Sequence, residues 1–360
     1  MHGHGKVFIF AITMGKITII DVAKLAGVSK GTVDRVLHNR GEVSKKSEAK
    51  VLAAIDRLKF EPNLHASMLA TKREMNIACL LPAPESGEYW DKVRSGCIMG
   101  GEELSSLGVD VRLFLYDQYD AESFRWVAEE MLESSPVGVI LPPMFRDDTR
   151  VLTERLRALR IPYVYIDSRI EDDGCLAYFG MPSYRSGVLA AHLLTERCPA
   201  EEVRDILCVR LLRDKSGLSD PTMERRAGFT DYIGEHFPGC SIHNVFIHPH
   251  DPVRTEEVLD AYALEHPDTR LAVVFSSRVH LIADWLSAHP VPGRRVIGYD
   301  DLDKNLDALR SGAVSVLIGQ HMTDYARQAV MTVADFALKH KQPSQRDNFV
   351  HMDILTSYNI

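Results

Sequence analysis

The sequence predicts an all-α N-terminal domain of helix-turn-helix type, followed by a larger α/β core of two doubly wound parallel-sheet subdomains. Three observations lead to this prediction. Residues 18–37 have the pattern of two short helices around a tight turn, short strands alternate with helices after residue 75, and the two regions differ in charge. The 360 residues are enough for two or three domains with ample cores.

The first helix is expected to begin after Thr18, which can serve as its N-cap, with Asp21 as the partner in a short capping box. The apolar positions around this helix are Ile20, Val22, Ala23 and Leu25. Gly27 is expected to end it, because glycine readily adopts the left-handed backbone that a tight turn between helices needs.

Ser29 can N-cap a second helix, whose apolar residues recur at spacings of three and four. These residues are Val33, Val36 and Leu37. The pair has the layout of a helix-turn-helix, in which the second helix enters the DNA major groove, although a helical hairpin in an enzyme is the alternative. A third helix is expected from its N-cap Ser44 to about Phe60.

Charge separates the N-terminal region from the rest of the chain. Residues 14–75 contain 12 Lys and Arg against seven Asp and Glu, a net charge of +5. Residues 76–360 contain 29 against 43, a net charge of −14. A small basic module on an acidic body is typical of a DNA-binding domain attached to a domain that does not bind DNA. Double-stranded DNA is therefore the expected partner of the basic module.

Several motifs follow one another in this region. They are Asp21-Val-Ala-x-x-Ala-Gly-Val-Ser, Thr32-Val with Arg35-Val, Val43-Ser, and Pro62-Asn with Ala66 and Leu69. Together they closely resemble the headpiece and hinge of the lactose/galactose repressor (LacI/GalR) family. The resemblance implies a transcriptional regulator, commonly a repressor, with a headpiece at 16–61 and a hinge helix and linker at 62–75. It also implies a core at 76–360 like the type I periplasmic sugar-binding proteins.

The second helix is expected to read DNA. Lys30, Gly31, Asp34 and Arg35 would face base edges, while Ser29, Thr32 and Lys45 or Lys46 would hold phosphates. Asp34 stands where the family usually has serine, and it can either accept from cytosine N4 or pair with Lys30 one turn away. Besides Lys45 or Lys46, the expected DNA contacts are Thr18, Ser29, Lys30, Gly31, Thr32, Asp34, Arg35, Asn39, Ser44, Asn63, Ala66 and Leu69.

Residues 63–70 resemble the hinge helix of the family. The segment is too short to be stable alone, so we expect it to order on DNA when two copies pack together. Leu69 would then insert into the minor groove and kink the operator. Two paired hinges predict a homodimer on a pseudo-palindromic operator.

Strands and helices are expected to alternate through the core. The expected strands are 77–81, 109–115, 137–141, 163–166, 206–211, 242–247, 271–275, 295–299 and 314–318. The expected helices are 89–107, 121–133, 147–159, 184–197, 222–237, 252–265, 279–288, 302–310 and 322–338. This alternation predicts βαβ units, too many for one comfortable sheet, and so two subdomains.

The resemblance implies three crossings of the chain between the subdomains. We place them near 172–176, 300–305 and 338–345. The N-subdomain would then comprise about 76–173 and 304–340, and the C-subdomain about 174–303 and 341–360.

Ligands of doubly wound sheets bind beyond the carboxyl ends of the strands. The candidate effector contacts are Tyr89, Trp90, Asp167, Arg169, Arg225, Ser276, Asp300 and Gln320. Asp167, Arg225, Asp300 and Gln320 match sugar-contact positions of the family, and such side chains hydrogen-bond vicinal hydroxyls. Alternatively, Asp300 or Asp301 is a helix N-cap and Trp90 a core residue. The expected effector is a sugar or sugar derivative.

Two departures from the family pattern bear on the effector. Ser276-Ser277 replaces an Asn-Asp pair, and Pro182-Ser183 replaces an Asp-Asn pair, so ligands for hydroxyls are lost. An ordinary free hexose is therefore not required. Arg169, Arg210 and Arg213 leave room for an anionic effector such as a sugar acid or phosphosugar.

Other classes of function have weaker support. His248-Pro-His250-Asp251 lacks a third ligand at useful spacing, so neither a metal site nor a cofactor is expected. A P-loop, a nucleophile elbow and an acid/base constellation are missing, which argues against a fused carbohydrate-active enzyme. A transport-associated sugar-binding protein is the other rival, but it would need export and no basic headpiece. We do not expect an enzyme.

Cysteine spacing and hydropathy predict a cytoplasmic protein without membrane contact. Six scattered cysteines form no C-x-x-C pair, and no apolar run reaches the length of a membrane span. Residues 7–12 are apolar but short for a secretory signal. Residues 1–15 are expected to be a disordered leader, with Met14 as an alternative start.

Overall fold

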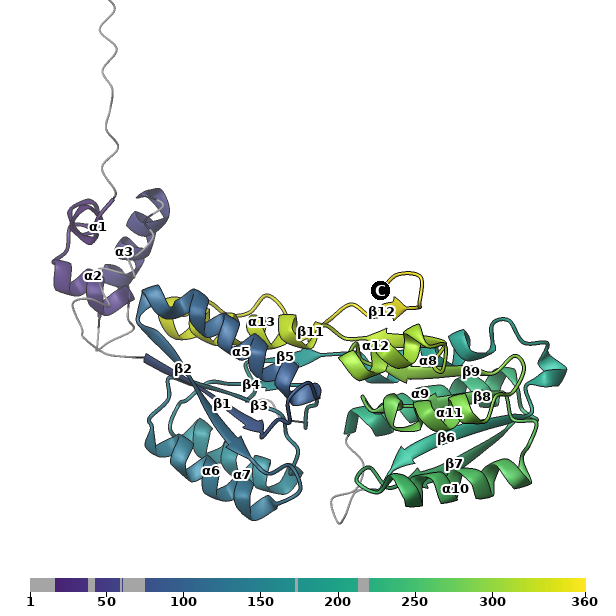
Figure 1. Ribbon diagram of the computed structural model, residues 1–360. Helices are drawn as coiled ribbons and strands as arrows, with labels where there is room; N and C mark the ends of the chain where they lie inside the picture. Colours follow the sequence, from purple (N-terminus) through teal and green to yellow (C-terminus); the bar gives the residue numbers. More distant parts are fainter. Residues whose placement is uncertain (1–16, 38–42, 59, 61–74, 172–173, 213–219) are drawn as a thin grey trace, which may run out of the picture. The chain divides into compact units, whose positions relative to one another are not determined.

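The computed structural model describes residues 17–37, 43–58, 60, 75–171, 174–212 and 220–360 (Figure 1). The chain divides into two compact units, Met1–Arg73 and Glu74–Ile360. The leader at 1–15, Asn39, and the hinge residues Asn63, Ala66 and Leu69 lie outside the described residues.

Three helices form the first unit: α1 (Ile19–Ala26), α2 (Lys30–Leu37) and α3 (Lys45–Leu58). The carboxylate of Asp21 accepts from the backbone N–H of Thr18 at 2.8 Å, and hydrogen bonds from Thr18 lower the pKa of Asp21. Gly27 ends α1 in the left-handed region, at φ 66°. Ser29 Oγ accepts from the N–H of Thr32 at 3.1 Å and so caps α2. The expected turn chemistry is confirmed.

A small apolar core holds the three helices together. It consists of Val22, Ala23, Ala26, Val33, Val51, Ala54 and Phe60. Val36 and Leu37 pack against this core, so the expected apolar face of α2 is confirmed. On α1 only part of the expectation holds, because Ile20 and Leu25 are 51% and 43% exposed.

The second unit contains two lobes, each built on a six-stranded sheet. The N-lobe sheet has the order β11-β5-β4-β3-β1-β2. Its strands are β1 (Met75–Pro82), β2 (Val109–Tyr116), β3 (Gly138–Leu141), β4 (Tyr163–Ile166), β5 (Ala177–Gly180) and β11 (Asp347–Phe349). Its helices are α5 (Tyr89–Leu104), α6 (Ala121–Glu133), α7 (Arg146–Ala158) and α13 (Met322–Lys339), with a 3₁₀ turn at Ser105–Leu107.

The C-lobe sheet repeats this topology in the order β12-β10-β9-β8-β6-β7. Its strands are β6 (Asp205–Leu211), β7 (Ser241–Ile247), β8 (Leu271–Val274), β9 (Arg295–Tyr299), β10 (Val316–Gly319) and β12 (Asp353–Leu355). Its helices are α8 (Ser183–Thr195), α9 (Asp220–His236), α10 (Pro252–Glu265), α11 (Ala283–Ala288) and α12 (Asp303–Arg310), with 3₁₀ turns at Ala200–Glu202 and Val279–Ile282. All strand pairs are parallel except β10 with β12.

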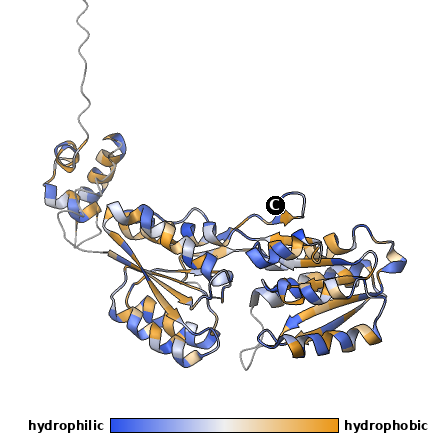
Figure 2. Ribbon diagram, viewed as in Figure 1, coloured by the Kyte–Doolittle hydropathy of each residue, from blue (hydrophilic) through white to orange (hydrophobic). Residues whose placement is uncertain are grey.

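Helices cover both faces of each sheet, and the strands between them are the most apolar segments (Figure 2). In the N-lobe, α6 and α7 pack on one face around Phe124 and Leu156, while α5 and α13 pack together. In the C-lobe, α8 and α9 cover one face of the sheet, with Phe229 of α9 in the core between them. The helices α10 to α12 cover the other face, with Leu259 of α10 in its core. The expected doubly wound architecture is confirmed. No helix of the described residues combines the length and hydropathy of a bilayer span.

The chain crosses between the lobes later than expected at each point. β5 pairs with β4, so the first crossing follows Gly180 and not 172–176. β10 pairs with β9, so the second follows Gly319 and not 300–305. β11 joins the N-lobe and β12 the C-lobe, so the third falls after Phe349 and not at 338–345. The expected subdomain bounds were wrong because these short strands are defined by distant partners, not by their own apolar pattern.

Candidate functional site

A pocket of about 100 Å³ lies between the two lobes of the second unit. From the N-lobe it receives residues that follow β1, β2, β3 and β4, and from the C-lobe residues that follow β6, β7, β8 and β10. Both sheets therefore present their carboxyl ends to it, as expected for a doubly wound fold.

Most of the expected effector contacts meet in this pocket. Those that line it are Tyr89, Trp90, Asp167, Arg225, Ser276 and Gln320. Asp300 lies behind Gln320, whose amide Nε2 donates to Asp300 Oδ1 at 2.7 Å. Of the expected set, Asp300 is buried behind the pocket lining and Arg169 lies elsewhere.

Hydrogen bonds to both its side chain and its backbone fix Asp167 at the end of β4. Its Oδ1 accepts from Tyr89 Oη at 2.5 Å, and its backbone carbonyl accepts from Tyr178 Oη at 2.9 Å. The backbone of Asp167 is left-handed, with φ 63°. Its N–H donates to the carbonyl of Phe179 at 2.9 Å, and this bond holds that conformation. Burial, and then the charge of Asp167, raise the pKa of Tyr89 well above its ordinary value, so Tyr89 stays a hydrogen-bond donor.

Asp300 occupies the equivalent place at the end of β9. Its φ is 70°, and its N–H donates to the carbonyl of Ile318 at 3.0 Å. The side chain is fully buried, and burial raises the pKa of its carboxyl while the nearby positive charge of Arg225 opposes the rise. Leu302, not Asp300 or Asp301, is the N-cap of α12, so the helix-cap interpretation is wrong.

Arg225 lies in the pocket wall and is only 4% exposed. Its Nη1 donates to the carbonyl of Phe275 at 2.7 Å, and its guanidinium lies 4.3 Å from the ring centre of Tyr299. Within the described part of the chain, its Nε and the nearby Ser276 Oγ are buried without a hydrogen-bond partner. Each such atom costs about 1–3 kcal/mol when unsatisfied. A ligand bearing several hydroxyl groups could supply the missing partners.

The two aromatic residues after β1 combine packing with exposure to the pocket. Trp90 is 7% exposed, so it is both a core residue and part of the pocket lining. The rings of Tyr89 and Trp90 meet edge to face, with centroids 5.0 Å apart. This wall can cover an apolar face of a small ligand.

An ion pair across the pocket was not anticipated from the sequence. Glu88 Oε2 accepts from Arg278 Nε at 3.1 Å, with side chains 14% and 17% exposed. Both line the pocket, as do Gln118 and Tyr119 after β2. All four residues follow the end of a strand. The expectation that ligands bind beyond the carboxyl ends of strands could therefore have identified them as well.

Arg169 is a correction to the expected site. Its guanidinium pairs with Asp347 on β11 and lies over the rings of Tyr178 and Phe349, at 5.1 and 5.9 Å. A carboxylate and two aromatic faces therefore hold it away from the pocket. Arg210 stacks 4.6 Å over Phe246 and does not line the pocket, and Arg213 lies outside the described residues. These three arginines therefore give no reason to expect an anionic effector.

In the first unit, α2 presents an exposed polar surface. Ser29, Lys30, Gly31 and Arg35 are exposed, and Thr32 and Asp34 are half-buried. Thr18 and Ser44 are also exposed, and both engage in hydrogen bonds at helix starts. Thus the cations Lys30 and Arg35 of α2 are exposed, while Val33 faces the core.

The motif and the pocket define a class of protein, one that combines a helix-turn-helix domain with a two-lobed ligand-binding domain. Residues 18–63 match the model of the bacterial regulatory proteins of the lacI family, and residues 77–341 match a periplasmic binding protein domain. The chain belongs to the lacI family of bacterial regulatory proteins.

Individual relatives agree with this assignment. A crystal structure described as a LacI transcriptional regulator from Bacteroides fragilis is 32% identical and has a TM-score of 0.74. The match covers 80% of this chain and 98% of the Bacteroides fragilis chain. The ribose operon repressor of Halalkalibacterium halodurans is 26% identical over 79% of this chain and 80% of its own length.

Other matches are partial. The regulator DegA of Bacillus subtilis is 41% identical over 80 residues, which are 22% of this chain and 24% of DegA. The regulator RegA of Clostridium saccharobutylicum is 29% identical over 55% of this chain and 56% of its own length. The chain thus spans between a quarter and just over half of these two relatives.

Proposed function

We propose that the protein is a repressor that binds a pseudo-palindromic operator as a homodimer. A small neutral ligand with several hydroxyl groups would bind between its lobes and change operator affinity. The observation that carries this proposal is the convergence of Arg225, Ser276 and Gln320 on one interlobe pocket, with Gln320 held from behind by the buried Asp300. The unpaired buried Nε of Arg225 and Oγ of Ser276 suit hydroxyl groups, which both donate and accept.

The charge of the pocket favours a neutral effector. Its lining contains Glu85, Glu88 and Asp167 against Arg225 and Arg278, and Glu88 already neutralises Arg278. An anionic ligand would meet this excess of carboxylates. Because relatives from two organisms are named ribose operon repressors, D-ribose belongs in the first panel of candidates.

Effector binding would act by changing how the lobes are held. The pocket draws residues from both lobes, so a bound ligand favours whichever lobe arrangement completes its contacts. Operator affinity then changes only by the difference in ligand affinity between the two arrangements, and the coupling is reciprocal. Asn63, Ala66 and Leu69 would transmit the change by pairing and by inserting Leu69 into the minor groove.

The test begins with selection of a preferred site from random double-stranded DNA by the full-length protein. Fluorescence anisotropy then measures affinity for that site with and without each sugar of a pentose and hexose panel. We expect one sugar class to shift operator affinity by at least about fivefold, the lower end of usual allosteric coupling. Arg225→Lys should abolish the shift without changing affinity in its absence, because lysine lacks the planar fork and the stacking on Tyr299.

Arg226→Lys, at the next position, is the matched control and should retain the response. Failure of the wild-type protein to select any DNA sequence would refute the repressor assignment. Sugar binding without DNA binding would instead favour a solute-binding protein.

A further inference from the structure

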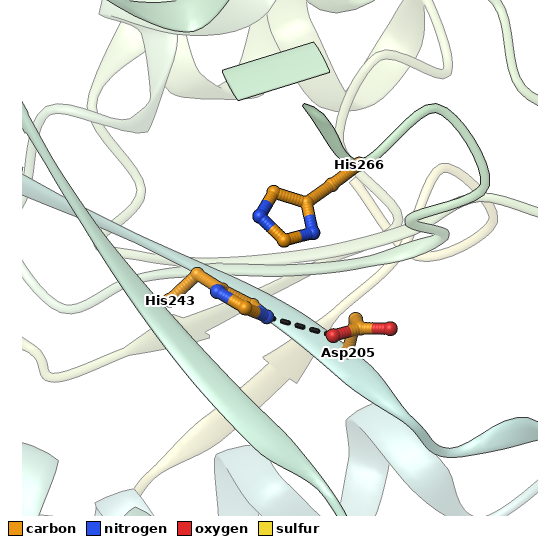
Figure 3. A group of neighbouring side chains, drawn as sticks. All are labelled: Asp205, His243 and His266. Atoms are coloured by element: carbon orange, nitrogen blue, oxygen red, sulfur yellow. Dashed lines mark hydrogen bonds and ion pairs between the residues drawn. The ribbon is translucent and has the colours of Figure 1, made fainter. Parts of the chain in front are cut away.

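Three side chains with metal-ligating atoms meet on the C-lobe, apart from the interlobe pocket. Asp205 begins β6, His243 lies on β7, and His266 follows α10. Their ligating atoms all lie within 4.8 Å of one another (Figure 3). Because β6 and β7 are parallel, with Asp205 beside Ser241, this group lies at the amino edge of the sheet. The pocket lies at the carboxyl edge, so the two sites are separate.

The three residues are oriented by their surroundings. His243 Nε2 lies 2.7 Å from Asp205 Oδ1, which directs one imidazole at the carboxylate. His266 lies over His243, with ring centroids 4.1 Å apart, and stacks on Tyr262 at 4.7 Å. Tyr262 in turn is fixed by a 3.0 Å hydrogen bond between its hydroxyl and Thr269. The stacking on Tyr262 restricts the orientation of the His266 ring.

We propose that Asp205, His243 and His266 bind one divalent transition-metal ion of the Zn²⁺ type. Two imidazoles and one carboxylate are a donor set that Zn²⁺, Co²⁺ and Ni²⁺ take, with water completing the coordination. The side chains of His243 and Asp205 are 27% and 42% exposed, so an ion and its water can reach them. Ca²⁺ and Mg²⁺ prefer oxygen donors and are not favoured here.

Small side-chain movements would complete the site. Two ligand atoms on one tetrahedral Zn²⁺ are separated by about 3.3 Å, so Asp205 and His243, now 2.7 Å apart, must part slightly, and ligand atoms as far as 4.8 Å apart must approach. Partly exposed side chains can make this change. The ion would then join β6, β7 and the connection from α10 to β8.

Sequence spacing could not reveal this group. Its members are separated by 38 and 23 residues and come together only through the β6–β7 pairing and the return of α10. The sequence drew attention instead to His248-Pro-His250-Asp251, where Asp251 Oδ1 accepts from the N–H of Arg254 as the N-cap of α10.

The test is a Co²⁺ titration of the full-length chain, followed by visible d–d absorption, with Zn²⁺ competition against a chromophoric chelator. His2 and His4 are both changed to Gln as the background, so that they cannot supply a second site. We expect one bound ion per chain, with affinity lowered about 100-fold by His266→Gln and by Asp205→Asn. In Asp205→Asn the asparagine still accepts a hydrogen bond from His243 but carries no charge. The variant should therefore fold normally, so a loss of affinity reports on metal binding.

His236→Gln is the matched control. His236 is an exposed histidine stacked on Tyr232, outside the proposed site, and its change should leave the affinity unaltered. Zn²⁺ should also raise the melting temperature of the background protein but not of His266→Gln. Equal metal affinity in the background, His266→Gln and Asp205→Asn proteins would overturn the proposal, and so would the lack of stoichiometric uptake.

Discussion

Gly187 on α8 lies directly against the backbone carbonyl of Arg225 on α9. A Cβ at residue 187 would stand 1.8 Å from that oxygen, and one at Gly228 would stand 2.0 Å from the carbonyl of Tyr184. The two helices therefore approach each other through paired glycines. This close approach fixes the backbone position of Arg225, from which its side chain reaches the pocket.

Gly187→Ala should disturb both stability and ligand binding. The methyl group cannot fit without separating α8 from α9, so the free energy of unfolding should fall by about 3 kcal/mol, as for an overpacked core. Urea unfolding measures this loss, and calorimetry with the identified effector should show weaker binding because Arg225 is displaced. Gly234→Ala on the same α9 is the control, since a Cβ there meets nothing within 4 Å. It should raise stability by about 0.5–1 kcal/mol through helix propensity. A stable Gly187→Ala protein with unchanged affinity would contradict this account.

The ion pair of Glu88 and Arg278 should couple the two lobes measurably. Its side chains are mostly buried and 3.1 Å apart, so a double-mutant cycle with Glu88→Gln and Arg278→Gln should give a coupling of about 1 kcal/mol. The cycle is read from urea unfolding. The exposed pair of Asp307 and Arg310 is the comparison and should give about 0.3 kcal/mol. Equal couplings for the two pairs would show that Glu88 and Arg278 gain nothing from burial.

Asp300→Asn should stabilise the ligand-free protein at neutral pH and weaken effector binding. Burial raises the pKa of Asp300, so the folded state binds its proton more tightly than the unfolded state. Stability from this group is therefore full below the unfolded pKa and is lost as pH rises through the raised folded pKa. Asparagine does not ionise, and Gln320 can rotate its amide to suit it.

Urea unfolding of Asp300→Asn and wild type at several pH values checks this prediction. The advantage of the variant should be largest at neutral pH and shrink as pH falls toward the ordinary range of aspartate. An advantage that grows on acidification would have the wrong sign and reject the pKa direction.

Lys30 and Asp34 test which residues of α2 read the operator. Lys30→Ala should weaken specific binding by about 1–3 kcal/mol if Lys30 contacts a base edge. Asp34→Ser should change the preferred base at one position if Asp34 accepts from cytosine. Repeating the site selection with each variant measures both effects. Identical selected sites from both variants and wild type would remove these residues as readers.

Local chemistry in the sequence was enough to define the headpiece. Thr18, Gly27 and Ser29 act through their immediate neighbours, so caps and a left-handed turn can be read directly from the chain. The alternation of strands and helices likewise predicted a doubly wound core. Asp167, Arg225 and Gln320 could be named because ligands of such sheets bind where strands end.

Long-range pairing was decided only by the tertiary structure. The three crossings depend on which strand β5, β10 and β11 join, and strands of three or four residues carry too little pattern to show it. For the same reason the sequence could not foresee that Asp347 holds Arg169 away from the pocket, or that Glu88 meets Arg278 across 190 residues.

The sequence by itself thus determined the kinds of secondary structure, the DNA-reading motif and the strand-end positions of the pocket. Each of these depends on residues within a few positions of one another. Tertiary structure alone decided which side chains share a site, because Asp205, His243 and His266, like Glu88 and Arg278, become neighbours only when distant strands and loops are brought together by folding.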